Sequence, residues 1–320
     1  ASACAILILL GEHAVVYGEP ALAIPFSGLR ARAAVEAWIG APSGRIHIFA
    51  RELDLDEEWS ELPENNLIRN ALSLVLAELG IERLPTCKLN ISSEIPISAG
   101  LGASAALAVA VMRAFSAFLG HPLDPERLNA LAFKSETLMH GTPSGIDNTV
   151  VVYEQPILFA RSQVFQVIRP AAELHFLVAD SGIKKATAST VNQLAQDYAQ
   201  NPGEIGPIIR DIGELSMEGV RALTLGDQSA LGAALNANQE LLTLLNLSCP
   251  ELDVLIQAAR SAGALGAKLT GGGKGGHMLA LVQPEHLDQV REALLQAGAP
   301  HIYHPVLKQG IVAAPEQGRG

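Results

Sequence analysis

Two glycine-rich stretches carry the residue types best suited to binding phosphate. The first, AGLGASAALA at 99–108, places Gly100 and Gly102 directly before a small and apolar run that is typical of a buried helix. A glycine loop at a helix N-terminus exposes unpaired backbone N–H groups, and the helix dipole adds positive potential there. Ser104, in the first helical turn, offers a hydroxyl to Mg²⁺ or to a phosphate oxygen. By itself the pattern favours a tight turn with close helix packing, because it is neither a P-loop nor a GxGxxG motif.

The second stretch, TGGGKGG at 270–276, holds five glycines in seven positions. Glycine costs backbone entropy on folding, so such a density calls for a physical reason. A concave site lined with backbone N–H groups, which would bind an anion, is one such reason. A flexible loop is the other, and this stretch alone does not separate the two.

Acidic residues in two other segments are further candidates for chemistry. Glu136 falls near the end of an expected helix, and Asp147 follows a loop that contains glycine and proline. Carboxylates beside phosphate loops usually bind Mg²⁺ or activate a hydroxyl, whereas isolated acids are more often solvated or cap a helix. Glu12 and His13 follow the first strand, where the pair could bind a hydroxyl or carboxylate, although a lone histidine is usually structural.

The composition excludes some partners. The net charge of −11 argues against a nucleic acid or an anionic membrane surface as the main partner. The three cysteines, Cys4, Cys87 and Cys249, form no CxxC pair, which fits a reducing cytosol and a cytoplasmic protein. We see no secretory signal and no membrane span, because Arg113 interrupts the longest apolar run.

Hydrophobic periodicity predicts an interleaved α+β protein with a domain boundary near 155–170. We expect domains over 1–165 and 166–320. Strands are expected over 4–10, 22–38, 45–49, 87–92, 174–179 and 278–282, and a glycine-rich loop over 268–277. Helices are expected over 66–79, 103–119, 124–139, 187–198, 205–224, 227–245, 250–262 and 284–297.

Four segments taken together and in order resemble the GHMP small-molecule kinases, most closely their mevalonate-kinase branch. They are GEHAVVYGEPALA (11–23), PISAGLGASAA (96–106), HGTPSGIDN (140–148) and KLTGGGKGGH (268–277). The first and third are rather specific to that branch, whereas the glycine loops mark only the wider family. The resemblance implies a two-domain α+β GHMP kinase fold, with an N-terminal domain like domain 2 of ribosomal protein S5 and a ferredoxin-like C-terminal domain.

The resemblance also implies a reaction, in which the γ-phosphoryl group of ATP passes to the C5 hydroxyl of mevalonate and gives 5-phosphomevalonate. Its partners would be these two small molecules and Mg²⁺, with a homodimer common in the family. Asp147 would orient or deprotonate the hydroxyl, and Ser104 and Glu136 would hold Mg²⁺. Glu12, His13, Thr187 and Gly271 would lie at the mevalonate side. ATP would contact Pro96, Gly100, Leu101, Gly102, Ala103, Ser104 and Ala105.

One departure bears directly on rate. The family's first motif usually reads like APGK, and here the aligned residues are Ala3-Cys-Ala-Ile6, so Ile6 stands at the position of the lysine. That lysine is expected beside the catalytic aspartate, where it would lower the hydroxyl pKa and offset phosphate charge. Isoleucine can do neither. A cation over developing charge in a dry site contributes several kcal/mol.

Three interpretations follow from Ile6. An active kinase could draw its positive charge from Lys184 or Lys185. A disabled form could still bind ATP and mevalonate. A relative could phosphorylate or decarboxylate a related mevalonate derivative, although the intact HGTPSGIDN segment weighs against this. A non-catalytic metabolite sensor is the competing hypothesis from another class, and retention of Ser104, Glu136 and Asp147 opposes it.

Overall fold

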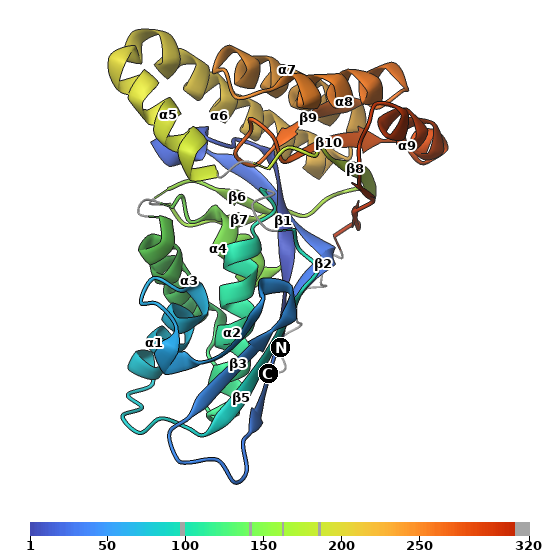
Figure 1. The fold of residues 1–320 in the computed structure, drawn as a ribbon. Coiled ribbons are helices and arrows are strands. Elements are labelled where there is room, and N and C mark those ends of the chain that lie inside the picture. The colour runs from blue at the N-terminus through green and yellow to red at the C-terminus, as the bar shows by residue number, and fades with distance from the viewer. Residues whose placement is uncertain (97–99, 141–142, 162, 185–186, 311–320) are drawn as a thin grey trace, which may run out of the picture.

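A computed structural model describes residues 1–96, 100–140, 143–161, 163–184 and 187–310. Its strands form two sheets (Figure 1). The first has the order β4-β3-β5-β2-β6-β7, with β1 paired to β2, and the second has the order β11-β8-β10-β9, with β12 paired to β8. Strand bounds in the first sheet are β1 (Ser2–Leu10), β2 (Ala21–Ala37), β3 (Ile46–Ala50), β4 (Leu55–Glu58), β5 (Cys87–Ser93), β6 (Ile157–Phe159) and β7 (Gln166–Val167).

The second sheet and the helices complete the chain. Its strands are β8 (Leu174–Asp180), β9 (Gly266–Thr270), β10 (His277–Val282), β11 (Ile302–Tyr303) and β12 (Val306–Leu307). The helices are α1 (Leu67–Glu78), α2 (Ala103–Phe118), α3 (Pro125–His140), α4 (Ile146–Tyr153), α5 (Thr187–Gln200), α6 (Pro202–Leu225), α7 (Gln228–Leu244), α8 (Pro250–Ser261) and α9 (Leu287–Gln296). Short 3₁₀ turns are η1 (Ala14–Tyr17), η2 (Arg51–Leu53), η3 (Trp59–Glu61) and η4 (Pro284–His286).

Helices cover one face of each sheet (Figure 1). Helix α2 packs against β1 and β2, and α1 and α3 pack against α2. In the second half, α7 packs along β9, α8 covers β9 and β10, and α6 reaches both α7 and the first sheet. Strand β1 is buried along almost its whole length, since both the helices and its neighbour β2 cover it. Strand β1 therefore contacts helices from both halves of the chain, α2 and α4 from the first and α6 and α7 from the second.

Most of the expected elements are confirmed, and three differences bear on the site. Strand β2 (Ala21–Ala37) is one long strand, where we expected more than one over 22–38. Helix α4 at 146–153 was not predicted, because its valines favour a strand by local propensity and only burial against the neighbouring helices makes it helical. Residues 266–270 form the buried strand β9, so the first part of the expected loop over 268–277 belongs to the second sheet.

The changeover between sheets lies between β7 and β8, a few residues beyond the expected domain boundary at 165/166. The domain limits themselves stay a prediction. Among the described residues, no helix has the length and apolar character needed to cross a bilayer.

Candidate functional site

A cavity of about 830 Å³ lies between the two halves of the chain. Most of its lining comes from the first half, whereas α5 and the second glycine loop supply the remainder. Its lining includes Ile8, Glu12, His13, Glu52, Leu53, Leu55, Asn66, Leu67, Ile68, Ser93, Glu94, Ile95, Pro96, Gly100, Gly102, Ala103, Ser104, Leu107, Glu136, Asp147, Asn148, Val191, Asn192, Gly271 and Gly272.

The first glycine loop forms one wall of this cavity at the start of α2. Gly100 and Gly102 both have left-handed backbone conformations, with φ of 74° and 70°, and α2 begins at Ala103. A side chain at Gly102 would place its Cβ 3.0 Å from Cγ1 of Ile6, so there is little room for one. The loop therefore turns sharply, and the first turn of α2, whose N–H groups have no intrahelical partner, lies at the cavity wall, as an anion site requires.

Residues of this loop divide into two groups. Pro96, Gly100, Gly102, Ala103 and Ser104 line the cavity. Leu101 and Ala105, which we expected at ATP, are buried and are not part of the described lining. The Leu101 carbonyl instead accepts a hydrogen bond from the Ile6 N–H at 3.0 Å, so this residue fastens the loop to β1.

The two glycine loops touch each other, backbone against backbone. A Cβ added at Gly271 would lie 2.6 Å from the Cα of Gly100, closer than real Cβ contacts allow. A Cβ at Gly100 would lie 3.1 Å from the Cα of Gly271. The second loop thus supports the first across the junction of the two sheets, and absence of side chains makes this contact possible.

A hydroxyl and a carboxylate meet at the N-terminus of α2. The Ser104 side chain hydrogen-bonds the carboxylate of Glu136, which is 5% exposed and lies one turn before the end of α3. Burial raises the pKa of Glu136, and the hydrogen bond from Ser104 opposes that shift. Both residues line the cavity. A buried carboxylate next to a hydroxyl and to backbone N–H groups suits a site shared by a cation and a phosphate.

Asp147 reaches the cavity from the first turn of α4. Gly145 before it has a φ of 95°, and the Thr149 hydroxyl donates to the Gly145 carbonyl at 2.6 Å. This local bonding fixes where α4 starts. It therefore fixes the position of Asp147 as well.

Glu12 and His13 are nearly inaccessible from outside. Glu12 forms a buried ion pair with Lys268 of β9. The Nε2 of His13 hydrogen-bonds the carbonyl of Gly272 at 3.1 Å, and burial lowers the His13 pKa to about 4. The neutral His13 imidazole therefore donates from Nε2 to the second glycine loop. Only its other ring nitrogen is left for mevalonate, where we had expected His13 to bind.

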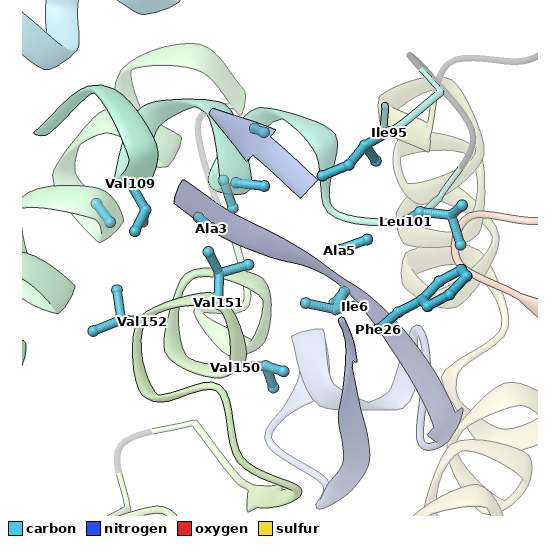
Figure 2. Packing of buried hydrophobic residues seen from close by; sticks show 14 of the residues in the cluster. Ala3, Ala5, Ile6, Phe26, Ile95, Leu101, Val109, Val150, Val151 and Val152 are labelled. Carbon is cyan, nitrogen blue, oxygen red and sulfur yellow. The ribbon is translucent and has the colours of Figure 1, made fainter. Parts of the chain in front are cut away.

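Ile6 is not among the described lining residues of the cavity. It is 1% exposed and belongs to the apolar cluster beneath the first loop, among the packed side chains in Figure 2. It lies on the same face of β1 as Ile8, which does line the cavity, because alternate residues of a strand point the same way. The Ile6 side chain therefore points towards the first glycine loop but carries no charged or polar group there.

The candidate replacement cations are not brought to the cavity. Lys184 is exposed and outside the described lining, and Lys185 lies outside the described residues. The side chain of Thr187, at the start of α5, is also outside the description. Five acids, Glu12, Glu52, Glu94, Glu136 and Asp147, face the cavity, and none of its described lining residues is Lys or Arg.

Sequence reasoning missed several lining residues. Asn192 and Val191 enter from α5, and an apolar end is built by Leu53, Leu55, Leu67, Ile68 and Ile95. No short motif marks them, because segments far apart in the sequence supply them. The sequence patterns assign no role to Lys268. Its strand, GAKLT at 266–270, shows no clear alternation of polar and apolar residues, and only the structure shows that all five positions are buried.

Comparisons with known proteins agree with this geometry. The family model described as "GHMP kinases N terminal domain" matches residues 66–155, and "GHMP kinases C terminal" matches 217–300. The mevalonate kinase of Thermococcus sibiricus is 35% identical over 97% of both chains. That of Pyrococcus furiosus is 34% identical over the same shares. The solved structure of the L. major mevalonate kinase in complex with R-mevalonate has a TM-score of 0.82 at 30% identity, covering 96% of this chain and 95% of that one.

Proposed function

Because this chain belongs to the GHMP kinases, we propose that it transfers the γ-phosphoryl group of ATP to the C5 hydroxyl of mevalonate. One observation carries the proposal. The Ser104–Glu136 pair and Asp147 line the same cavity, at the N-terminus of the helix that follows the glycine loop. Phosphoryl transfer depends mainly on positioning and charge neutralisation, and this arrangement provides the groups for both.

ATP lies with its triphosphate against residues 100–104 and its base in the apolar end of the cavity. Flat, weakly polar bases suit a slot made of Leu53, Leu67 and Ile95, with Asn66 to offer hydrogen bonds. The backbone N–H groups at the start of α2 meet the phosphate oxygens. Acidic side chains elsewhere in the lining would repel the triphosphate, so a cation must accompany it.

Mg²⁺ fits the oxygen donors of Ser104 and Glu136. No cluster of three or more His, Cys, Asp or Glu side chains in the described residues could hold a metal alone. This matches a magnesium ion held by one or two protein oxygens together with phosphate oxygens. When bound, it offsets the negative charge of the phosphates. Its positive charge would also favour the ionised form of Glu136, against the effect of burial.

Asp147 accepts the proton of the C5 hydroxyl or fixes its direction. The hydroxyl oxygen forms a bond to the γ-phosphorus as the bond from that phosphorus to the ADP oxygen breaks. Glu12 lies at the acceptor side, beside the loop that holds His13. The result is 5-phosphomevalonate and ADP.

The other interpretations explain the site less well. A sensor needs no aspartate beside its phosphate loop, and relatives that match nearly the whole chain are named mevalonate kinase. The cation would come from Mg²⁺ and the helix terminus, since Lys184 stays outside the described lining. A homodimer stays a prediction from the family resemblance, and a cytoplasmic location stays a prediction from the isolated cysteines.

The proposal predicts that ADP release from Mg·ATP depends on mevalonate and on Mg²⁺. Ser104→Ala should raise the Mg²⁺ concentration for half-maximal rate by about tenfold or more, because one oxygen donor and the bond to Glu136 are lost. Steady-state ADP release at a series of Mg²⁺ concentrations measures this. Ser116→Ala, on the same helix but far from its N-terminus, is the control.

Two results of this titration would count against the proposal. No mevalonate-dependent ADP release in the parent chain would contradict the function. An unchanged Mg²⁺ dependence in Ser104→Ala would contradict the metal site alone.

A further inference from the structure

The Glu12 carboxylate stands between the cavity and the second half of the chain. It is 1% exposed and lines the cavity. One oxygen, Oε1, pairs with the Lys268 ammonium group on β9. The other, Oε2, accepts a hydrogen bond from Asn238 Nδ2 on α7 at 3.1 Å. Both partners are donors, and both come from the half of the chain opposite to Glu12.

Lys268 is itself held in place by its strand. It is 0% exposed, and its Nζ also donates to the Leu269 carbonyl at 2.6 Å. Strand β9 ends the order of the second sheet, and α7 supplies hydrogen bonds along its outer edge. Asn236 Oδ1 accepts from the Ala267 N–H at 3.0 Å, and Gln239 Oε1 accepts from the Leu269 N–H at 2.9 Å. The ammonium group is therefore buried and bonded to its own strand, which α7 holds along its outer edge.

The Asn238 side chain bonds Glu12 through its amide nitrogen only. Its Oδ1 is buried and has no hydrogen-bond partner in the described part of the chain. Rotating the amide would place that oxygen against the carboxylate, where two acceptors would repel each other. With this orientation Oε2 of Glu12 is an acceptor, as it is in an ionised carboxylate, and the Asn238 carbonyl oxygen is left unsatisfied among the described residues.

The Lys268 charge and the Asn238 hydrogen bond oppose the effect of burial on Glu12. Burial raises the pKa of that carboxyl group. Burial also lowers the pKa of Lys268, and Glu12 opposes that shift. His13, the titratable neighbour on the same loop, is neutral above about pH 4 because burial lowers its pKa to about 4. The charge that acts on Glu12 therefore comes from β9, while α7 adds an uncharged donor.

We propose that Lys268 and Asn238 are positioning residues that hold Glu12 ionised and aimed at the acceptor pocket, where Glu12 accepts a hydrogen bond from a hydroxyl of mevalonate. The inference rests on the proposed function. By this inference β9 and α7, in the second half of the chain, contribute to mevalonate binding indirectly, through their contacts with Glu12. Neither Lys268 nor Asn238 is among the described lining residues of the cavity.

The test measures mevalonate affinity by titration calorimetry across a pH series, together with KM and kcat for both substrates. Lys268→Met should weaken mevalonate binding by about ten- to hundredfold, since a bond to a charged acceptor is lost when Glu12 takes up a proton. The loss should grow as pH falls, because removing the ammonium group raises the pKa of Glu12 and moves the acid limb to higher pH. ATP affinity should stay within about twofold.

A double variant separates action through Glu12 from direct action. In a Glu12→Gln background, adding Lys268→Met should cost little further mevalonate affinity, because the carboxylate that the lysine holds is already gone. Lys268→Arg should restore part of the affinity. Lys88→Met is the matched control, since Lys88 lies over the Trp38 ring, 5.3 Å from its centroid and away from the cavity. If Lys268→Met does not fold, Asn238→Ala carries the test, with an expected loss of about three- to tenfold.

Several outcomes would overturn the inference. Unchanged mevalonate affinity at every pH would do so, as would fully additive losses in the double variant. Equal losses of ATP and mevalonate affinity with a lower Tm would show that the pair is only a structural brace. A parent chain that neither binds nor phosphorylates mevalonate would contradict the proposed function itself. A parent chain that binds mevalonate, with variants of unchanged affinity, would contradict only this inference.

Discussion

Asp147→Asn is expected to reduce kcat for mevalonate phosphorylation by about 10²- to 10⁴-fold, the range typical of a lost general base. Asparagine keeps the shape of the side chain and the start of α4, which Gly145 and Thr149 fix independently. What it loses is the negative charge that attracts the hydroxyl proton. Because Asp147 lies on α4 rather than on the glycine loop, the KM for ATP should change little.

Pre-steady-state and steady-state assays of ADP formation measure this effect. Asp227→Asn is the control, since Asp227 caps α7 and asparagine caps a helix equally well. Retention of turnover within about tenfold of the parent would remove Asp147 from the role of base or orienting group. A matching loss of ATP affinity would instead indicate that α4 had moved.

Gly271→Ala is expected to lower kcat/KM for both substrates by about hundredfold, the effect of misplacing a reacting group by about 1 Å. The added Cβ would lie 2.6 Å from the Cα of Gly100, so one of the two loops must shift. Backbone cannot yield as a flexible side chain can. The shift would therefore reach the phosphate-binding N–H groups at the start of α2.

Gly120→Ala separates this contact from simple backbone strain. Gly120 has a φ of 81°, close to the 79° of Gly271, and no atom of the described residues lies within 4 Å of a Cβ added there. Both variants should lose similar stability from the left-handed conformation, about 1–2 kcal/mol. Only Gly271→Ala should lose activity. Equal activity in the two variants would show that the loops do not depend on each other.

Local sequence patterns predict the parts of the site that belong to one segment. The glycines at 100 and 102, the helix after them and Ser104 in its first turn form a continuous pattern with a local physical cause. The same holds for most strands and helices, because their burial shows as a period of two or of about 3.6 residues. Site residues carried by such segments could be predicted from the sequence.

Other features depend on contacts that no local pattern encodes. Lys268 and Glu12 are 256 positions apart, and only the folded chain shows that they pair. Helix α4 has β-branched residues that favour a strand, and packing against α2 and α3 overrides that preference. The family resemblance shows that Ile6 stands where a lysine is usual. Only the structure shows that the Ile6 side chain is buried and packs against Gly102.

With Ile6 in place of the family lysine, this chain should still phosphorylate mevalonate. The most direct test compares ADP release by the parent chain and by Ile6→Lys, with Mg·ATP and mevalonate, and locates the phosphate in the product by ³¹P NMR. We expect turnover in both, within about tenfold of each other, with the phosphate on the C5 oxygen. Turnover in Ile6→Lys alone would contradict it, and would mean that the parent chain is a disabled kinase.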